Sequence, residues 1–277
     1  MSVRVTILCD NTVGPIAGTL GEHGFSALIE WDGGSLLFDT GGGETLLHNA
    51  LRMNRNLRLI SAVVLSHGHY DHTGGLRQLL QLTGKRPVYA HPGVFAPRYR
   101  VKDTGEAVPL GIPFSEDFLR VLGADFDLCS TFRRIAPGVF LTGEVCRSTA
   151  FEIGDTGLYA DSLGNLRDEL IDDQSLIIKG ERGLTLVLGC CHAGLINTIR
   201  AARELTGVQE VQAVIGGTHL GFSSTQQLDA TVSALREFRV RKIYGTHCTG
   251  FTAAARLHRE FPGQFLAAQV GTSLEII

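Results

Sequence analysis

The sequence has 277 residues, 44% of them hydrophobic, which is enough apolar material for a single α/β domain with a large core. Its formal charge of −3 at pH 7 gives no overall attraction to nucleic acids or to an anionic membrane surface. No stretch approaches the roughly 20 apolar residues that span a bilayer, and the N-terminal residues resemble a strand rather than a signal peptide. We therefore expect a cytoplasmic protein with a small-molecule partner and predict neither nucleic-acid nor membrane binding.

The hydrophobic pattern predicts strands that alternate with helices. Apolar, β-branched runs bounded by glycine predict strands at Val3–Leu8, Phe25–Trp31, Ser35–Phe38, Ala62–Leu65, Ser175–Lys179, Leu184–Leu188, Val211–Ile215 and Lys242–Tyr244. Apolar residues at three- and four-residue steps predict helices at Glu44–Met53, Gly74–Leu82, Leu195–Leu205, Thr225–Phe238 and Thr252–Glu260. This order favours an α/β fold, with sheets covered by helices, over an all-β sandwich.

The two halves of the chain show a weak internal repeat. Residues 26–39 form a predicted hairpin, followed by a glycine turn, a helix and the strand Ala62–Leu65, after which a histidine follows. Residues 175–189 begin the same order, which ends with the strand Val211–Ile215. Two similar half-sheets that face each other would bury both apolar faces and leave a cleft where their strand-end loops meet.

The segment Pro92–Asp173 is less periodic and contains several prolines and basic residues. We interpret it as an inserted lid or substrate-shaping segment of the same domain rather than as a domain of its own. Its residues Arg98, Arg100 and Lys102 belong either to a solvated surface or to a rim that binds an anion.

A histidine cluster follows the predicted strand Ala62–Leu65. His67 and His69 are two residues apart, so in extended backbone both imidazoles point to the same side and can reach one metal ion. Asp71 and His72 follow at once and offer ligands for a second ion. Four ligands from one short segment would be strained around a single ion, so the spacing predicts a metal site completed by residues from elsewhere.

Three later histidines are candidates for those further ligands. His192, His219 and His247 each follow an apolar strand and have a glycine nearby. The remaining histidines lack this context and are set aside; they are His23, His48, His91 and His258. Taken singly, each candidate is better explained as a hydrogen-bonded histidine, but three at equivalent strand ends favour ligation.

Six cysteines show no regular spacing, and a chain of this length does not need disulfides, so we expect reduced thiols. Three of them stand beside candidate histidines, in Cys190-Cys191-His192 and His247-Cys248. Small residues that pack at crowded strand ends are one explanation. Direct metal ligation or redox sensitivity is the other.

The segment His67-Gly68-His69-Tyr70-Asp71-His72 resembles the metallo-β-lactamase superfamily, whose hallmark is His-x-His-x-Asp-His followed by distant histidines. The resemblance implies one αββα sandwich domain over residues 1–277, built from two pseudo-symmetric half-sheets, and two divalent metal ions, with zinc expected and manganese or iron as alternatives. It assigns the first ion to His67, His69 and His192, and the second to Asp71, His72 and His247. It also implies that Asp39 braces the metal loop.

The sequence departs from the superfamily at one position. A metal-bridging aspartate usually stands where this chain has His219. A neutral imidazole cannot bridge two cations as a carboxylate does. Either water alone bridges the ions, another acid substitutes, or the second ion is weakly held.

Several short motifs point to a narrower resemblance. They are Asp10-Asn11, Glu22-His23-Gly24-Phe25-Ser26, Gly189-Cys190-Cys191-His192-Ala193-Gly194, Gly216-Gly217-Thr218-His219-Leu220 and Thr246-His247-Cys248-Thr249-Gly250. Together they resemble the dihydropterin–ribofuranosylaminobenzene 5′-phosphate synthase-like branch. Members of this branch are mostly described only as metal-dependent hydrolases, so the resemblance sharpens the fold more than the substrate.

The expected activity is hydrolysis of an ester, lactone or phosphoester by a metal-bound hydroxide. Asp71 would orient the water and accept its proton, and His219 would hold the substrate or donate to the leaving group. Asn11 and the three basic residues are the substrate-binding candidates. The alternatives are a synthase or transferase that acts on a phosphorylated, pterin-like substrate, and a non-catalytic metal-binding protein.

Overall fold

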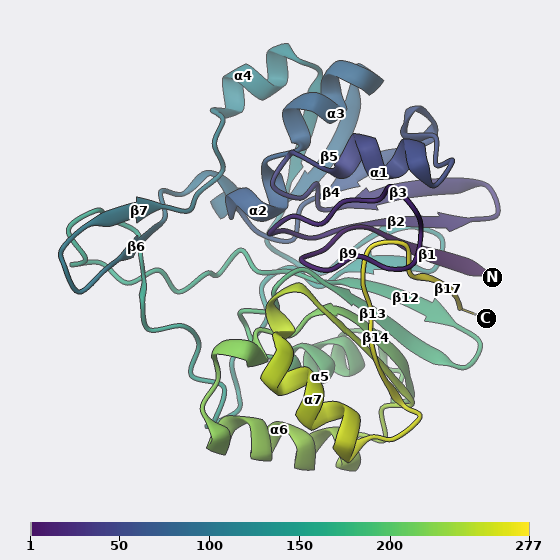
Figure 1. The fold of residues 1–277 in the computed structure, drawn as a ribbon, viewed down its shortest axis with the longest axis vertical. Helices are drawn as coiled ribbons and strands as arrows, with labels where there is room; N and C mark the ends of the chain where they lie inside the picture. Colours follow the sequence, from purple (N-terminus) through teal and green to yellow (C-terminus); the bar gives the residue numbers. More distant parts are fainter. Residues whose placement is uncertain (1, 277) are drawn as a thin grey trace.

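Two seven-stranded sheets pack face to face in the computed structural model, which describes residues 2–276 (Figure 1). The first sheet has the order β17 (Ser273–Ile276), β1 (Val3–Cys9), β2 (Ser26–Trp31), β3 (Gly34–Phe38), β4 (Ala62–Val64), β5 (Arg86–Ala90) and β8 (Ala124–Leu128). The second has the order β16 (Phe265–Ala267), β15 (Lys242–Thr246), β14 (Val211–Gly217), β13 (Gly183–Leu188), β12 (Leu176–Gly180), β10 (Val139–Leu141) and β9 (Arg133–Ala136).

Helices cover the outer face of each sheet (Figure 1). On the first sheet lie α1 (Leu46–Arg52), α3 (Leu76–Thr83) and α4 (Glu116–Val121); on the second lie α5 (Leu195–Thr206), α6 (Thr225–Glu237) and α7 (Phe251–Glu260). The single-turn helix α2 (Tyr70–Thr73) follows the histidine cluster. The four layers confirm the predicted fold class. No helix within residues 2–276 is long and apolar enough to cross a membrane.

The strands are apolar on both faces because each sheet lies between its partner sheet and a helix layer. In β2, Ile29 belongs to the core between the sheets, whereas its neighbour Leu28 packs with the helices. In β3, Phe38 likewise belongs to the core between the sheets, and Leu37 packs with the helices. Successive side chains of a strand point to opposite faces, so these continuous apolar runs follow from the four-layer architecture.

The two sheets repeat one pairing pattern. In the first, β1, β2 and β3 pair antiparallel, and β3, β4, β5 and β8 pair parallel. In the second, β10, β12 and β13 pair antiparallel, and β13, β14, β15 and β16 pair parallel. The edge strands β17 and β9 are each antiparallel to their neighbours. This symmetry confirms the repeat of two half-sheets.

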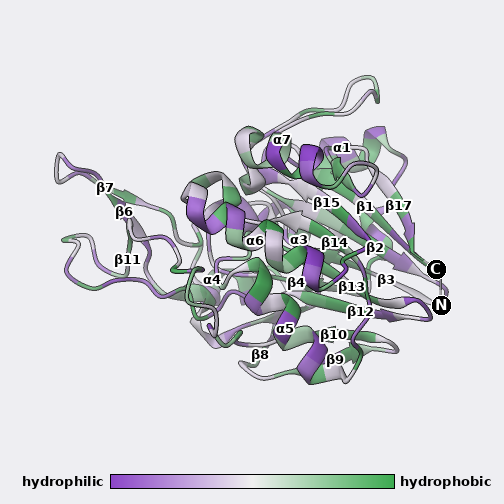
Figure 2. Ribbon diagram, turned by 90° about the horizontal axis from the view of Figure 1, so that it is seen from below, coloured by the Kyte–Doolittle hydropathy of each residue, from purple (hydrophilic) through white to green (hydrophobic). Residues whose placement is uncertain are grey.

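Residues 92–173 do not form one inserted unit. Helix α4 and strand β8 extend the first sheet, and strands β9 and β10 complete the second. Only β6 (Tyr99–Val101), β7 (Ala107–Pro109) and β11 (Leu158–Tyr159) form a separate three-stranded sheet. Figure 2 shows this small sheet at one side of the molecule, away from the two stacked sheets.

Candidate metal centre

The candidate ligands lie on loops that follow strands of both sheets. His67 and His69 follow β4, while His192, His219 and His247 follow β13, β14 and β15. Strands β13, β14 and β15 run parallel to one another, and β4 runs parallel to β3, so the loops after their carboxyl ends gather at one edge of each sheet. The histidines that follow these separate strands in the sequence therefore lie around one cleft.

The backbone is strained at this edge. Four residues other than glycine adopt positive φ there: Asp39 (59°), Cys191 (62°), His219 (53°) and His247 (46°). Left-handed backbone costs roughly 1–3 kcal/mol for such residues and gathers where a site dictates side-chain direction. The rest of the fold offsets this cost, which directs the side chains of His219 and His247 at the cleft and that of Asp39 at His72.

His67, His69 and His192 form the first group of candidate ligands. One ring nitrogen from each lies within 4.8 Å of the others, and all three side chains are buried. His67 Nε2 is 2.9 Å from His69 Nδ1. Both nitrogens of His192 lack a hydrogen-bond partner among residues 2–276, although the residue is only 4% exposed. Unpaired buried polar atoms are costly, and a cation among them would satisfy them.

Asp71, His72 and His247 form the second group. Asp71 Oδ2 lies 3.3 Å from His247 Nε2 and 3.7 Å from His72 Nε2. Nitrogen and oxygen ligands about 2.0–2.2 Å from a tetrahedral zinc ion are about 3.3–3.6 Å apart. The two distances from Asp71 are near this value, and the set whose ligand atoms all lie within 4.8 Å of one another joins Asp71 and His247 with His23 rather than with His72.

His23, which the sequence analysis set aside, also reaches the second group. Its Nε2 lies 3.2 Å from Asp71 Oδ2, and its side chain is 56% exposed. No buried strand runs directly into His23, which is why the strand-end criterion missed it. The signal that could have found it is the segment Glu22–Ser26, which was part of the narrower resemblance.

Asp39 fixes two of the imidazoles. Its Oδ2 accepts hydrogen bonds from His72 Nδ1 at 2.7 Å and from the Ser66 hydroxyl at 2.7 Å. Ser66 Oγ in turn lies 2.8 Å from His67 Nδ1 and accepts its proton. With Nδ1 of each histidine held by its partner, Nε2 is the atom that can bind a metal ion once it carries no proton, which is the usual way a protein orients metal-binding imidazoles.

Asn11 was expected to bind substrate, but it lines neither of the two cavities that open onto the candidate centre. It contacts candidate metal ligands instead. Its Oδ1 accepts a hydrogen bond from His247 Nδ1 at 2.8 Å, and its Nδ2 lies 3.3 Å from His23 Nδ1. The neighbouring Asp10 accepts the backbone N–H of His247 at 2.7 Å. Both side chains position His247.

The two groups differ in their electrostatics. Burial lowers the pKa of His69 to about 3, so this histidine is neutral at pH 7. Although burial opposes the charge, the carboxylates of Asp71 and Asp39 raise the pKa of His72 to about 9. Burial is likewise outweighed at Asp71, whose pKa is held well below its usual range by His72 and by hydrogen bonds from His23 and His247.

A thiol lies between the two groups. Cys190 is 4% exposed, and its Sγ is 3.2 Å from His72 Nε2. The same sulfur lies within 4.8 Å of ligand atoms in three sets of residues. These sets are His67 with His72, His192 with His219, and His247 with Cys248.

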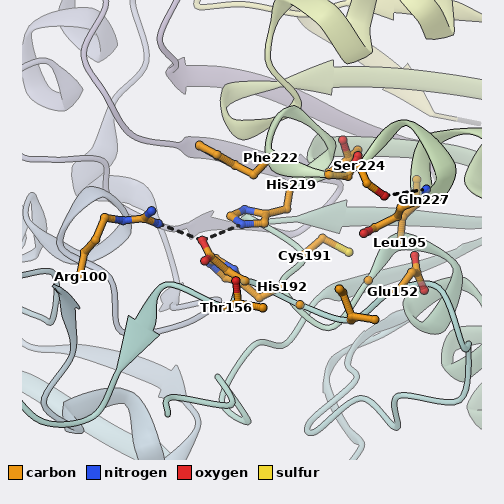
Figure 3. A pocket seen from close by; sticks show the side chains of 16 residues that line it. Arg100, Glu152, Thr156, Cys191, His192, Leu195, His219, Phe222, Ser224 and Gln227 are labelled. Carbon is orange, nitrogen blue, oxygen red and sulfur yellow. Dashed lines mark hydrogen bonds and ion pairs between the residues drawn. The ribbon is translucent and has the colours of Figure 1, made fainter. Parts of the chain in front are cut away.

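Two adjoining cavities open onto the centre. One of about 310 Å³ is lined by ligands of both groups, and one of about 400 Å³ extends toward α5 and α6. Arg100, Asp155 and His219 line both. Asp155 Oδ2 lies 2.9 Å from Arg100 Nη2 and 3.6 Å from His219 Nε2, as the dashed lines in Figure 3 mark.

Two of the three basic residues predicted to bind substrate lie outside both cavities. Arg98 is buried, pairs with Asp172 at 2.8 Å and lines neither cavity. Asp172 in turn accepts the backbone N–H of Gly68 at 2.9 Å, so Arg98 supports the loop between His67 and His69. Lys102 is exposed and pairs with Glu106 on the surface. Of the three, only Arg100 faces the cleft.

The fold and the ligand pattern define a class of protein. A family model described as the metallo-beta-lactamase superfamily matches residues 20–247. The chain therefore belongs to the metallo-β-lactamase superfamily, whose members are metal-dependent enzymes, and the resemblance inferred from the His67–His72 segment is confirmed.

Individual relatives narrow the comparison. The chain is 32% identical over 281 residues to 7,8-dihydropterin-6-methyl-4-(beta-D-ribofuranosyl)-aminobenzene-5′-phosphate synthase of Methanocaldococcus jannaschii, covering 98% of this chain and 95% of the relative. It is 31% identical over 258 residues to an uncharacterised protein of the same organism, covering 91% and 93%. The narrower resemblance to the synthase branch is thereby confirmed.

One solved structure shares the whole fold. The crystal structure of Tm1679, a metal-dependent hydrolase of the beta-lactamase superfamily, superposes with a TM-score of 0.85 at 28% identity, covering 99% of each chain. The names of these relatives thus include both a synthase and a hydrolase.

Proposed function

We propose that this protein is a hydrolase that holds two divalent metal ions, zinc being the expected one, and cleaves an ester, lactone or phosphoester. The observation that carries the proposal is the set of buried, unpartnered imidazole nitrogens at His69 and His192, which adjoin a cavity of about 310 Å³. Structural zinc sites usually close all four ligand positions with cysteine and histidine. A centre with carboxylate ligands beside a cavity favours catalysis.

The ligands divide into two sets in this proposal. His67, His69 and His192 would hold one ion, and Asp71, His72 and His247 the other. Bound divalent ions lower the pKa of water toward neutrality and polarise the oxygen of the bond to be cleaved.

The protein side chains supply proton transfer and positioning. Asp71 is ionised at neutral pH, so it accepts a hydrogen bond from the attacking water and orients it. Although burial opposes the charge, Asp155 raises the pKa of His219 to about 9. His219 is therefore protonated at pH 7 and can donate a proton to a leaving group in either cavity.

Arg100 indicates the substrate class. Its guanidinium lines both cavities and is 45% exposed, so it is accessible to a ligand. Guanidinium groups bind phosphates and carboxylates through charge-assisted hydrogen bonds. We infer a small anionic substrate whose charged group lies away from the bond that is cleaved.

A synthase or transferase activity is the second candidate. It is favoured by the 32% identity over nearly the full chain to the M. jannaschii synthase, whose name describes a phosphorylated aminobenzene product. Product analysis separates the two activities. Hydrolysis incorporates an oxygen from labelled water into one product, whereas a synthase joins two substrates.

Removal of one first-group ligand tests the metal assignment. His67→Ala or His69→Ala should lose one metal ion per chain and nearly all hydrolytic activity, because two imidazoles do not hold an ion alone. The measurements are metal content by mass spectrometry and turnover of a panel of esters, lactones and phosphoesters. His48→Ala, on α1 outside both ligand groups, is the matched control and should keep its metal. Unchanged metal content in the His67 variant would contradict the assignment.

A further inference from the structure

The superfamily usually places a carboxylate between its two ions, and this chain has His219 at that position. Its ring contacts His192, with centroids 4.3 Å apart, and its Nε2 lies 3.6 Å from Asp155. An imidazole with one available lone pair cannot join two cations. The position between the two ligand groups is therefore open to another donor atom.

Cys190 Sγ occupies that space. It shares one set of close ligand atoms with His67 of the first group and His72 of the second. A nitrogen and a sulfur bound to one tetrahedral zinc ion, at about 2.05 and 2.3 Å, are about 3.5 Å apart. The 3.2 Å separation between Cys190 Sγ and His72 Nε2 is close to this value. The unpartnered nitrogens of buried His192 are a second, independent indication of a cation here.

The backbone of β13 explains why the thiol comes so close. A side chain at Gly189 would place its Cβ 2.1 Å from Ser66 Oγ and 3.0 Å from Asp39 Oδ2. Only glycine lets the end of β13 pack directly on the two residues that orient His67 and His72. The next residue along the chain, Cys190, is thereby placed between the two groups.

The neighbouring Cys191 has a different environment. Its Sγ lies 3.3 Å from Thr198 Oγ1 and packs in the core between the second sheet and its helices. It belongs to none of the sets of close ligand atoms among residues 2–276. The two adjacent cysteines therefore differ in orientation, and only Cys190 faces the metal centre.

We propose that the Cys190 thiolate bridges the two metal ions, in place of the carboxylate that the superfamily usually supplies. This inference rests on the dinuclear centre of the proposed function. On binding, the thiol loses its proton to solvent and its sulfur forms one bond to each ion. A soft sulfur ligand favours zinc over manganese or magnesium.

X-ray absorption of the wild-type protein loaded with two zinc ions per chain tests the bridge directly. A bridging thiolate gives each zinc one sulfur neighbour at about 2.3 Å. A sulfur bound to one ion alone gives an average of half a sulfur per zinc and contradicts the bridge. Absence of sulfur scattering overturns the proposal altogether. This measurement needs no variant that has to fold.

Cobalt substitution identifies the residue. Wild-type protein loaded with Co²⁺ should show a near-ultraviolet sulfur-to-cobalt charge-transfer band. Cys190→Ser should lose the band and release metal on dialysis, whereas the matched control Cys191→Ser should keep both. If Cys248→Ser removes the band and Cys190→Ser does not, Cys248 is the ligand and the proposal is wrong.

The test also separates this inference from the proposed function. Metal-dependent hydrolysis by a wild-type protein without sulfur ligation would leave the function intact and overturn the thiolate bridge. Sulfur ligation in a protein that hydrolyses none of the panel substrates would support the bridge and contradict the hydrolase.

Discussion

The two groups of candidate metal ligands differ in the protonation state of their histidines before any ion binds. His69, with a pKa of about 3, is neutral at pH 7, whereas His72, with a pKa of about 9, carries a proton. An imidazole must be neutral to bind a metal ion. The first ion therefore displaces no proton from His69, while the second must displace one from His72.

This difference predicts that metal affinity depends on pH more strongly for the second ion than for the first. The His72 proton alone should make the apparent affinity for the second ion rise by up to about tenfold per pH unit from pH 7 to 9, and its contribution should level off above 9. A thiolate at Cys190 would release a further proton and extend the rise above pH 9, because burial raises the pKa of this thiol well above its usual range. Affinity for the first ion should change little over this range. Calorimetric titration in buffers of different ionisation enthalpy counts the protons released with each ion.

Asp39→Asn provides the control for the proton count. The Asp39 carboxylate is one of the charges that raise the pKa of His72, so its removal should lower that pKa and reduce the protons released with the second ion. It should also weaken metal affinity by about 10–100-fold, because Asp39 orients His72. Equal proton release for both ions in the wild-type protein would contradict the assignment of charge.

At the residue scale, most of the candidate metal centre could be predicted from the spacing of residues that are close in sequence. His67, His69, Asp71 and His72 are close in sequence, so their proximity in space could be predicted. His23 and Cys190 could not be placed in this way. His23 reaches Asp71 from a loop, and the direction of the Cys190 side chain depends on how closely β13 packs on Ser66. Both depend on tertiary packing, which no periodicity in the sequence records.

At the scale of elements, a buried carboxylate links the segment 92–173 to helix α5. Glu152 Oε1 accepts the N–H of Ile196 at 2.8 Å, and its Oε2 accepts the N–H of Asn197 at 3.0 Å. These N–H groups lie in the first turn of α5 and have no acceptor within the helix. A negative charge here is also stabilised by the helix dipole.

Glu152→Ala should therefore destabilise the protein by about 1–3 kcal/mol, because two buried N–H groups lose their acceptors. Urea unfolding monitored by circular dichroism measures the change. Glu152→Gln keeps one carbonyl oxygen as an acceptor and should lose less. Equal stability of the alanine variant and the wild-type protein would mean that water replaces the carboxylate.

The elements predicted from sequence were those with an uninterrupted apolar run or clear helical periodicity, the three-residue strand β4 among them. Strand β1 and helix α6 have clear apolar periodicity over many residues and were placed to within one or two residues. Strand β9 has four residues, two of them arginines, and β10 has only three, so neither gave a periodic signal. Their absence from the prediction made residues 92–173 look like one inserted lid.

At the scale of the whole molecule, the internal repeat explains the cleft. Each half-sheet ends in loops that carry candidate metal ligands, and the loops meet because the two sheets pack face to face. The first half supplies His67, His69, Asp71 and His72, and the second supplies His192 and His247. Loss of contact between the sheets would therefore separate the two parts of the metal centre. The sequence repeat was sufficient to predict this arrangement.

The position of the small sheet of β6, β7 and β11 could not be predicted, and it decides which basic residue reaches a substrate. Arg98 lies before the sheet and is buried against Asp172, whereas Arg100 lies in β6 beside the cavities. Lys102 lies one residue beyond β6, and its ammonium pairs with Glu106 on the surface. Three basic residues at two-residue spacing thus have three different environments.

Arg100→Ala should raise KM for a phosphorylated substrate by about tenfold, the equivalent of one charge-assisted hydrogen bond weakened by solvent and by competition from Asp155. The kcat should change little, because a charge remote from the reacting bond stabilises the bound substrate and the transition state alike. The loss should shrink as salt screens the guanidinium. Lys102→Ala removes a cation from the same small sheet without touching a cavity, so its KM should match the wild-type value. The measurement is steady-state kinetics of each variant with the phosphorylated substrate and with its dephosphorylated analogue. Equal losses on both substrates would mean that Arg100 supports Asp155 and His219 and does not bind the anion.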